Sequence, residues 1–212
     1  MKRYTILRAM LAILMALFLT NSYAQPDWEL IQKKDDIFIY KRSVAGSAYK
    51  QLKVVSDFQS SLHGFIAFLK DIPSQTTYMY NCSLSKVLKE SGNDEIIFYQ
   101  QLDAPWPFSN RDGIYRQQIK MDSLPGMATV KTTSLYDYIP LNKKFTRVKN
   151  VSCTWYIKQK PNGMVNVEYY FYGEPGGTLP GWLINLFIAE APYKTQKKMH
   201  ELIKQAKYQQ AN

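Results

Sequence analysis

The chain has 212 residues, of which 46% are hydrophobic and 14% aromatic, and its formal net charge at pH 7 is +10. This length suits one substantial domain or two small ones, and the apolar content is sufficient for a packed core, which excludes an intrinsically disordered chain. With two cysteines and two histidines, a disulfide-dense scaffold is excluded and little material remains for a metal site. A multi-pass membrane protein is excluded as well, and we expect no cofactor.

The first 24 residues have the pattern of a secretory signal peptide. Lys2 and Arg3 precede an apolar run over residues 9–19, and the small residues Ser22 and Ala24 stand at −3 and −1 of a cleavage site. The run of 11 residues is short for a spanning helix, which needs roughly 20. An uncleaved anchor is the alternative. We expect cleavage, export to the periplasm or secretion, and a single mature domain at residues 25–212.

Cleavage would remove three basic residues and no acidic one, so the net charge would fall from +10 to +7. The remaining basic residues are spread along the chain and form no nucleic-acid-binding motif, so we expect a solvated basic surface and no nucleic-acid partner. Transient contact with an anionic membrane surface is a further expectation. Cys82 and Cys153 each lie in an alternating pattern, and we expect free, buried thiols, with a disulfide as the alternative.

The mature chain begins with one short helix and two strands. Asp27 is expected to cap a helix that ends at Lys33, and alternation predicts strands at 37–42 and 48–57, with a turn at Gly46. A helix with an apolar face should then start at Ser60 or Ser61 and end before Pro73. Six further strands are predicted at residues 77–88, 95–102, 113–121, 127–136, 146–158 and 164–173. Their short connections predict antiparallel pairing.

The last predicted element is a long helix. Thr178 can cap it, Pro180 suits its first turn, and Pro192 should kink or break it. Its apolar stripe contains Leu183, Leu186, Phe187, Met199, Leu202 and Ile203. A long helix after an antiparallel run predicts a curved sheet wrapped around that helix, in an α+β fold.

Alternation also assigns the inward side chains of this sheet. The predicted inner face comprises Ile97, Tyr99, Gln101, Gly113, Tyr115, Gln117, Ile119, Met121, Ala128, Val130, Thr132, Ser134, Tyr136, Val151, Cys153, Trp155, Ile157, Val167, Tyr169 and Phe171. The mixture of aromatic, small and uncharged polar side chains suits an apolar cavity with a few orienting groups. A filled core whose polar groups bond to one another or to water is the alternative.

Four motifs resemble the START domains, the StAR-related lipid-transfer family. Residues 106–112 (WPFSNRD) resemble that family's W-P-x-S-x-R-D segment, and residues 140–148 (PLNKKFTRV) resemble its loop leading into a V-R strand. Trp155 matches its strand tryptophan, and residues 174–183 (EPGGTLPGWL) are similar to D-P-G-G-x-L-P-x-W-L. The resemblance covers residues 28–207, in order.

The resemblance implies a helix-grip fold: a U-shaped antiparallel sheet around the C-terminal helix, with a tunnel for one lipid. It also implies a gate formed by the loop at 137–145 and the helix from Leu179. Two departures stand out. Glu174 replaces the family's usual Asp, and Gln101 and Gln117 stand, within a residue, where sterol-binding members carry a buried acid–base pair, which puts a sterol ligand in doubt.

We therefore expect a non-enzymatic, monomeric protein that binds, and transfers, one lipid or other hydrophobic small molecule. The predicted ligand-binding residues are Tyr99, Gln101, Trp106, Arg111, Tyr115, Gln117, Val130, Thr132, Tyr136, Trp155, Tyr169, Phe171, Leu183 and Phe187. Arg111 and Asp112 either bind a head group or pair with each other to fix the turn before their strand. Trp106 and Trp155 are alternatively packing residues. An aromatase/cyclase-like enzyme and a lipid-sensing module are the alternative functions.

Overall fold

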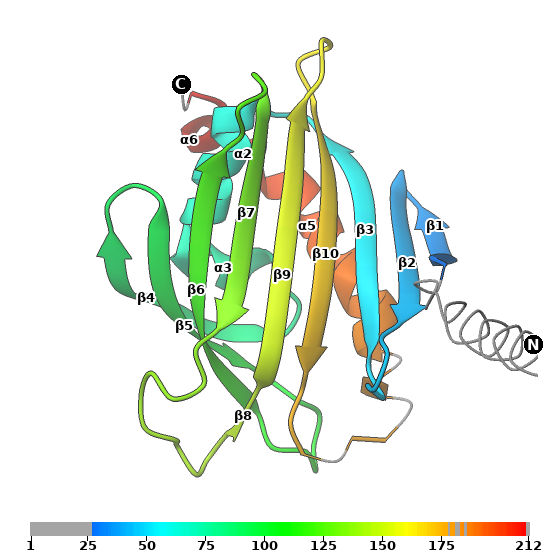
Figure 1. Cartoon of the computed structure of the whole chain (residues 1–212), viewed down its shortest axis with the longest axis vertical. Helices are drawn as coiled ribbons and strands as arrows, with labels where there is room; N and C mark the ends of the chain where they lie inside the picture. Colours follow the sequence, from blue (N-terminus) through cyan, green and yellow to red (C-terminus); the bar gives the residue numbers. More distant parts are fainter. Residues whose placement is uncertain (1–26, 178, 181–182, 185, 211–212) are drawn as a thin grey trace, which may run out of the picture.

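A curved antiparallel sheet forms the body of the protein, and the helices lie on its concave face (Figure 1). The computed structural model describes residues 27–177, 179–180, 183–184 and 186–210. The predicted signal peptide at 1–24 and the predicted cap Thr178 lie outside these residues. In the part of the chain that is described, no helix is long and apolar enough to cross a membrane.

The strands follow one another across the sheet in the order β1-β2-β3-β10-β9-β7-β6-β5-β4, and β8 pairs in parallel with β6. Their bounds are β1 Glu29–Lys34, β2 Ile37–Ser43, β3 Lys50–Phe58, β4 Cys82–Ser91, β5 Glu95–Leu102, β6 Arg111–Met121, β7 Met127–Ser134, β8 Thr146–Arg147, β9 Lys149–Gln159 and β10 Val165–Glu174. Because β10 pairs with both β3 and β9, the last strand joins the N-terminal and central parts of the sheet.

The helical segments cover the concave face. They are α2 Leu62–Lys70, the 3₁₀ turn η1 Ile72–Ser74, α3 Gln75–Tyr78, the π-helical turn η2 Leu186–Glu190, α5 Ala191–Leu202 and α6 Ala206–Gln209. Ser61 caps α2 as predicted, since its hydroxyl accepts a hydrogen bond from the Gly64 amide at 3.0 Å. The predicted break at Pro192 is also present, because α5 begins with Pro192 in its first turn, directly after η2.

The main core lies between the upper part of the sheet and helices α2 and α5. Phe58 and Phe65 pack with ring centroids 4.9 Å apart, and Trp155 contacts Phe65 from β9. Met199, in the last turn of α5, and Ile203, directly after the helix, are fully buried in the same cluster. This packing fixes α5 against the sheet at one end and leaves the other end of the interface to the pocket described below.

Two predicted elements were wrong. The helix from Asp27 to Lys33 is instead strand β1, which pairs with β2, and Trp28 packs edge-on against Tyr170 of β10. The strand predicted to start at residue 77 begins at Cys82, after η1 and α3. In both segments the hydrogen bonding and packing of the folded chain override a weak local preference.

Candidate functional site

A pocket of about 270 Å³ lies between the concave face of the sheet and the helices. Its sheet-side wall contains Phe98, Gln100, Arg111, Tyr115, Gln117, Thr132, Val151, Cys153, Trp155, Tyr169 and Phe171. Its helical wall contains Leu69, Gln75, Tyr78, Ile188, Thr195, Gln196 and Met199. Most of this surface is aromatic or aliphatic, so the pocket is suited to an apolar guest.

Amide side chains in the wall are held by bonds within the protein. Gln117 donates to the Leu69 carbonyl at 3.0 Å and so ties β6 to the end of α2. Gln75 of α3 accepts from Gln100 at 2.8 Å and from Ser85 at 2.8 Å. Because these groups are buried, their hydrogen bonds also fix the position of α3 on the sheet.

The Cys153 thiol and the Tyr115 and Tyr169 phenols of the wall are neutral near pH 7. Burial raises the pKa of Cys153 to about 12 and raises the pKa values of Tyr115 and Tyr169 above their usual range. The Tyr169 hydroxyl lies 3.6 Å from the Cys153 sulfur, across the β9–β10 pair. The wall therefore offers hydroxyl and thiol dipoles, rather than charges, along most of its length.

Arg111, the first residue of β6, is a buried charged side chain in this wall. The residue is only 6% exposed and lines the pocket. One terminal nitrogen, Nη1, donates to the Ser109 carbonyl at 2.6 Å, whereas Nε has no hydrogen-bond partner. Burial lowers the pKa of this guanidinium, although arginine stays protonated at physiological pH.

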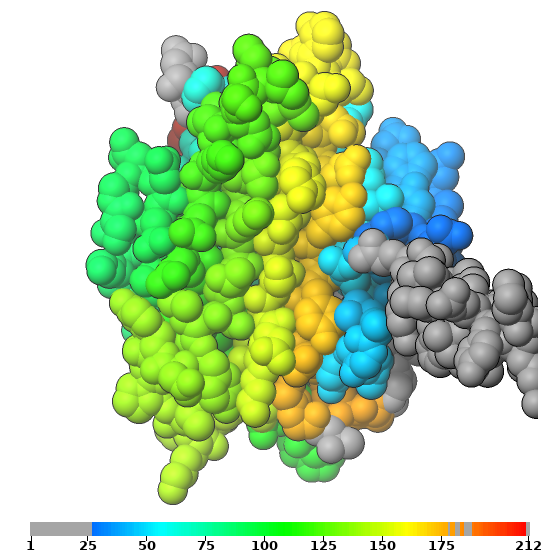
Figure 2. Space-filling view, in the orientation of Figure 1, coloured from blue at the N-terminus to red at the C-terminus, as the bar shows by residue number. Residues whose placement is uncertain are grey.

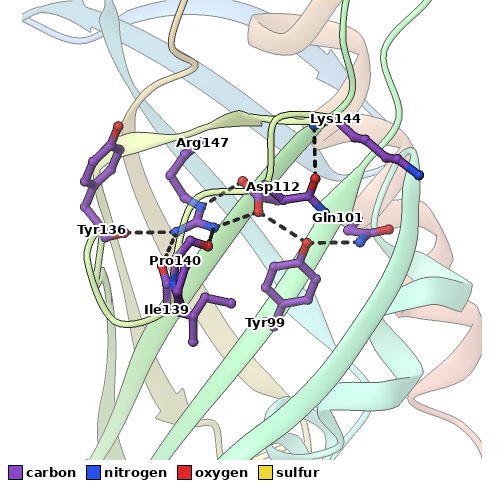
Figure 3. Close-up of polar contacts among 9 residues, drawn as sticks. Tyr99, Gln101, Asp112, Tyr136, Ile139, Pro140, Lys144 and Arg147 are labelled. Atoms are coloured by element: carbon purple, nitrogen blue, oxygen red, sulfur yellow. Dashed lines mark hydrogen bonds and ion pairs between the residues drawn. The ribbon is translucent and has the colours of Figure 1, made fainter.

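The neighbouring Asp112 belongs to a separate hydrogen-bond network, on the opposite face of the sheet (Figure 3). Its carboxylate accepts two bonds from Arg147, at 2.8 and 2.9 Å, and a third from the Tyr99 hydroxyl at 3.2 Å. Arg147 also donates to the carbonyls of Tyr136, Ile139 and Pro140. This buried network fastens the loop between β7 and β8 to the sheet.

The predicted pairing of Arg111 with Asp112 was therefore wrong. Successive side chains of a strand point to opposite faces, so Arg111 faces the pocket while Asp112 meets Arg147 on the far side. Arg147 itself is part of the matched segment 140–148, but the sequence pattern carried no sign of its partner.

Seven of the predicted ligand-binding residues line the pocket: Arg111, Tyr115, Gln117, Thr132, Trp155, Tyr169 and Phe171. Tyr99 and Gln101 do not, and their inward assignment was wrong by one residue. Phe98 stands opposite Tyr115, and Gln100 opposite Gly113, in the β5–β6 register. Directly opposed residues share a face, which places Phe98 and Gln100 inward and sends Tyr99 and Gln101 into the outer network.

Four other predicted site residues lie elsewhere. Trp106 is 92% exposed in the loop between β5 and β6, so neither a pocket position nor a packing role is observed for it. Val130 belongs to the main core, and Leu183 is fully buried outside the pocket wall. Tyr136 lines a second depression, together with Phe145, Arg147, Lys149 and Gly176. The side chain of the fourteenth predicted residue, Phe187, lies outside the described part of the structure.

The helical wall was missed from the sequence, apart from the apolar stripe containing Met199. Gln75 and Tyr78 come from α3, and Tyr78 lies within the strand that was predicted at residues 77–88. Cys82 and Cys153 are free thiols. Within the described ranges, no group of three or more His, Cys, Asp or Glu side chains is arranged to hold a metal ion.

The sequence model of the START domain matches residues 8–208. An uncharacterized protein of Pseudomonas aeruginosa is 31% identical over 177 residues, which are 84% of this chain and 86% of that protein. Human phosphatidylcholine transfer protein is 26% identical over 171 residues, 76% of this chain and 77% of its own length.

Among solved structures, the STAR-related lipid transfer protein fragment from Xanthomonas axonopodis shares 29% identity with this chain. It superposes with a TM-score of 0.77 over 84% of this chain and 99% of its own. The curved antiparallel sheet with its C-terminal helix confirms the expected helix-grip fold of the α+β class. The chain belongs to the START domain family.

Proposed function

We propose that this protein binds a single lipid or other hydrophobic small molecule in the pocket under α5 and transfers it without chemical change. The observation that carries the proposal is the pocket wall itself, where Tyr115, Trp155, Tyr169 and Phe171 face Met199 across an apolar space. Membership of a family with lipid-transfer relatives supports it.

The size of the pocket bears on the guest. Burial of apolar surface would drive binding with roughly 25 cal/mol per Å². The volume of about 270 Å³ is near the lower limit of small-molecule pockets, which span roughly 300–1,000 Å³. One acyl chain suits this volume better than two, and a two-chain phospholipid would require the pocket walls to move apart.

Entry and release would require the gate to move. The loop at 137–145 and the segment leading to α5 approach each other at the second depression, where Phe145 and Arg147 face Gly176 and Gly177. The π-helical turn η2 lies directly before α5 and contributes Ile188 to the pocket wall. Displacement of these segments would open the pocket while the sheet stayed in place.

We propose that this end of the molecule also contacts membranes transiently. Trp106 is 92% exposed and Leu141 is 59% exposed, and Lys143 and Lys144 are exposed beside Leu141. Figure 2 shows the loop between β7 and β8 projecting at this end. Exposed tryptophan and leucine side chains, together with exposed lysines, suit the interface of an anionic bilayer.

A non-enzymatic role is supported by the chemistry of the wall. A catalytic base works best with a pKa near the operating pH, whereas the thiol of Cys153 and the phenols of Tyr115 and Tyr169 have raised pKa values. Turnover of a bound polyketide-like molecule, with Tyr115→Phe abolishing it, would favour a cyclase-like enzyme instead.

Native mass spectrometry of protein purified from its own host, followed by uptake from liposomes, tests the proposal. We expect one lipid per chain. If the leader is removed on export, the protein mass should equal that of residues 25–212. Thr132→Phe should fill the pocket and reduce occupancy, whereas the control Thr133→Phe, at the adjacent exposed position, should not. A protein that is always empty and takes up nothing would contradict the proposal.

A further inference from the structure

Arg111 is a buried cation without a buried anion to balance it. Its Nε has no hydrogen-bond partner, and among the described residues no carboxylate lies within ion-pair distance of its guanidinium. Removing a charged group from water is costly unless the group is paired. The unpaired guanidinium of Arg111 would therefore be stabilised by an anionic ligand that enters the pocket.

The acids nearest in the chain and in the pocket wall have other partners. Asp112 is held by Arg147 on the opposite face of the sheet. Asp103, at the pocket rim, accepts from Ser83 and Asn110, and Glu174 accepts from the Tyr172 hydroxyl. Lys50 adds a second positive charge to the lining. The pocket thus contains a cationic anchor point that these carboxylates do not neutralise.

We infer that Arg111 binds an anionic head group, so that the guest is an amphiphile whose apolar chain ends in a carboxylate or a phosphate. The inference rests on the proposed function and specifies the class of ligand. Arginine's planar fork matches both groups, which it can bind through two parallel hydrogen bonds. Because Nη1 is occupied by the Ser109 carbonyl and Nε is fully buried, Nη2 is the nitrogen that would meet the ligand.

The geometry of β6 orients such a molecule. Arg111 begins the strand and Gln117 lies six residues further along it, so their Cα atoms are separated by roughly 20 Å at 3.4 Å per residue. The head group would lie at the end of the pocket where Pro175 also lines the wall, since Thr146 pairs with Arg111 and lies against Gly176. The tail would extend past Tyr115 toward Trp155 and Met199.

Binding of oleate and methyl oleate, measured by titration calorimetry on the mature protein, tests this assignment. The two molecules share one chain and differ in charge. We expect the wild type to prefer oleate by about tenfold to a hundredfold, the value of a buried charge-assisted hydrogen bond. Arg111→Met should abolish that preference, because oleate then loses its charged partner and binds no more tightly than methyl oleate.

Arg116→Met is the matched control, because it removes the same charge from the same strand on its outer face, where Arg116 approaches Glu95 at 3.6 Å. It should leave the preference intact. Arg111→Lys keeps the positive charge but lacks the planar guanidinium, so it should retain part of the preference for oleate. This variant tests the assignment if Arg111→Met does not fold. The urea midpoint of unliganded Arg111→Met should equal or exceed that of the wild type, because the unbalanced charge is gone.

Three results separate the possible failures. If the wild type binds neither oleate nor methyl oleate nor phospholipid, the proposed function fails. If it binds charged and uncharged chains equally, or if Arg111→Met keeps the preference for oleate, the assignment of Arg111 is wrong although the proposed function stands. A third arm compares oleate, phosphatidylglycerol and inorganic phosphate. If inorganic phosphate binds tightly and neither lipid does, the inference that the ligand is an amphiphile is wrong. Tight binding of oleate or of phosphatidylglycerol supports that inference and identifies the head group.

Discussion

At the scale of single residues, Arg111 and Asp112 show how strand alternation separates two roles. They are adjacent in sequence, yet one faces the pocket and the other the buried network on the outer face. Asp112 and Arg147 are almost completely buried and joined by two hydrogen bonds, so neither charge is left unpaired. The pair ties the β7–β8 loop to the sheet, whereas Arg111 has no ion-pair partner among the described residues.

Breaking the pair from one side should be costly. We expect Arg147→Met to lower the free energy of unfolding by about 3–5 kcal/mol, since it leaves the Asp112 carboxylate buried and unpaired and releases the carbonyls of the β7–β8 loop. Urea denaturation measures this. Lys198→Met, which breaks the exposed ion pair to Glu201, is the control and should cost less than about 1 kcal/mol. Equal losses in the two variants would show that the buried pair carries no special weight.

At the scale of elements, the inward face of a strand was predicted correctly where one face is buried and the other is exposed to solvent. On β7, buried Ala128, Val130 and Thr132 alternate with less buried neighbours, and the inward face was predicted correctly. On β5, Ile96 through Gln100 are all buried, because loop residues Leu135 and Ile139 cover the outer face. A strand that is buried on both faces shows no alternation of apolar and polar residues. Its sequence alone therefore could not show which residues face the pocket.

The loops at the open end carry a prediction about membranes. If Trp106 inserts into the interface, Trp106→Ala should weaken binding to vesicles of phosphatidylglycerol and phosphatidylcholine by about tenfold, a part of the free energy of burying one large apolar side chain. Cosedimentation measures it. Leu124→Ala is the matched control, because Leu124 is also exposed but lies in the turn between β6 and β7, at the other end of β6. Equal weakening by both changes would contradict a defined docking end.

At the scale of the whole molecule, one sheet serves both as a structural core and as the wall of the pocket. Phe58, Phe65 and Ile203 fill the space toward one end, while Tyr115, Tyr169 and Phe171 border the pocket toward the other. Hydroxyl and thiol groups are thereby buried in numbers that an ordinary apolar core would not contain. Their protonation ties the stability of the entire fold to pH.

Stability should fall as the solution becomes alkaline. Burial raises the pKa of Cys82 to about 11 and of Cys153 to about 12, and raises the pKa values of Tyr115 and Tyr169. In the unfolded chain these groups lose their protons between about pH 8.5 and 10. Above that range the unfolded state binds fewer protons than the folded state, so the free energy of unfolding decreases, by up to about 1.4 kcal/mol per pH unit for each group.

Urea denaturation from about pH 8 to about pH 11 should show this decline. Tyr169→Phe should make the decline shallower, because it removes one of the buried phenols with a raised pKa. A free energy of unfolding that stays constant over this range would mean that the phenols and thiols of the pocket are open to water.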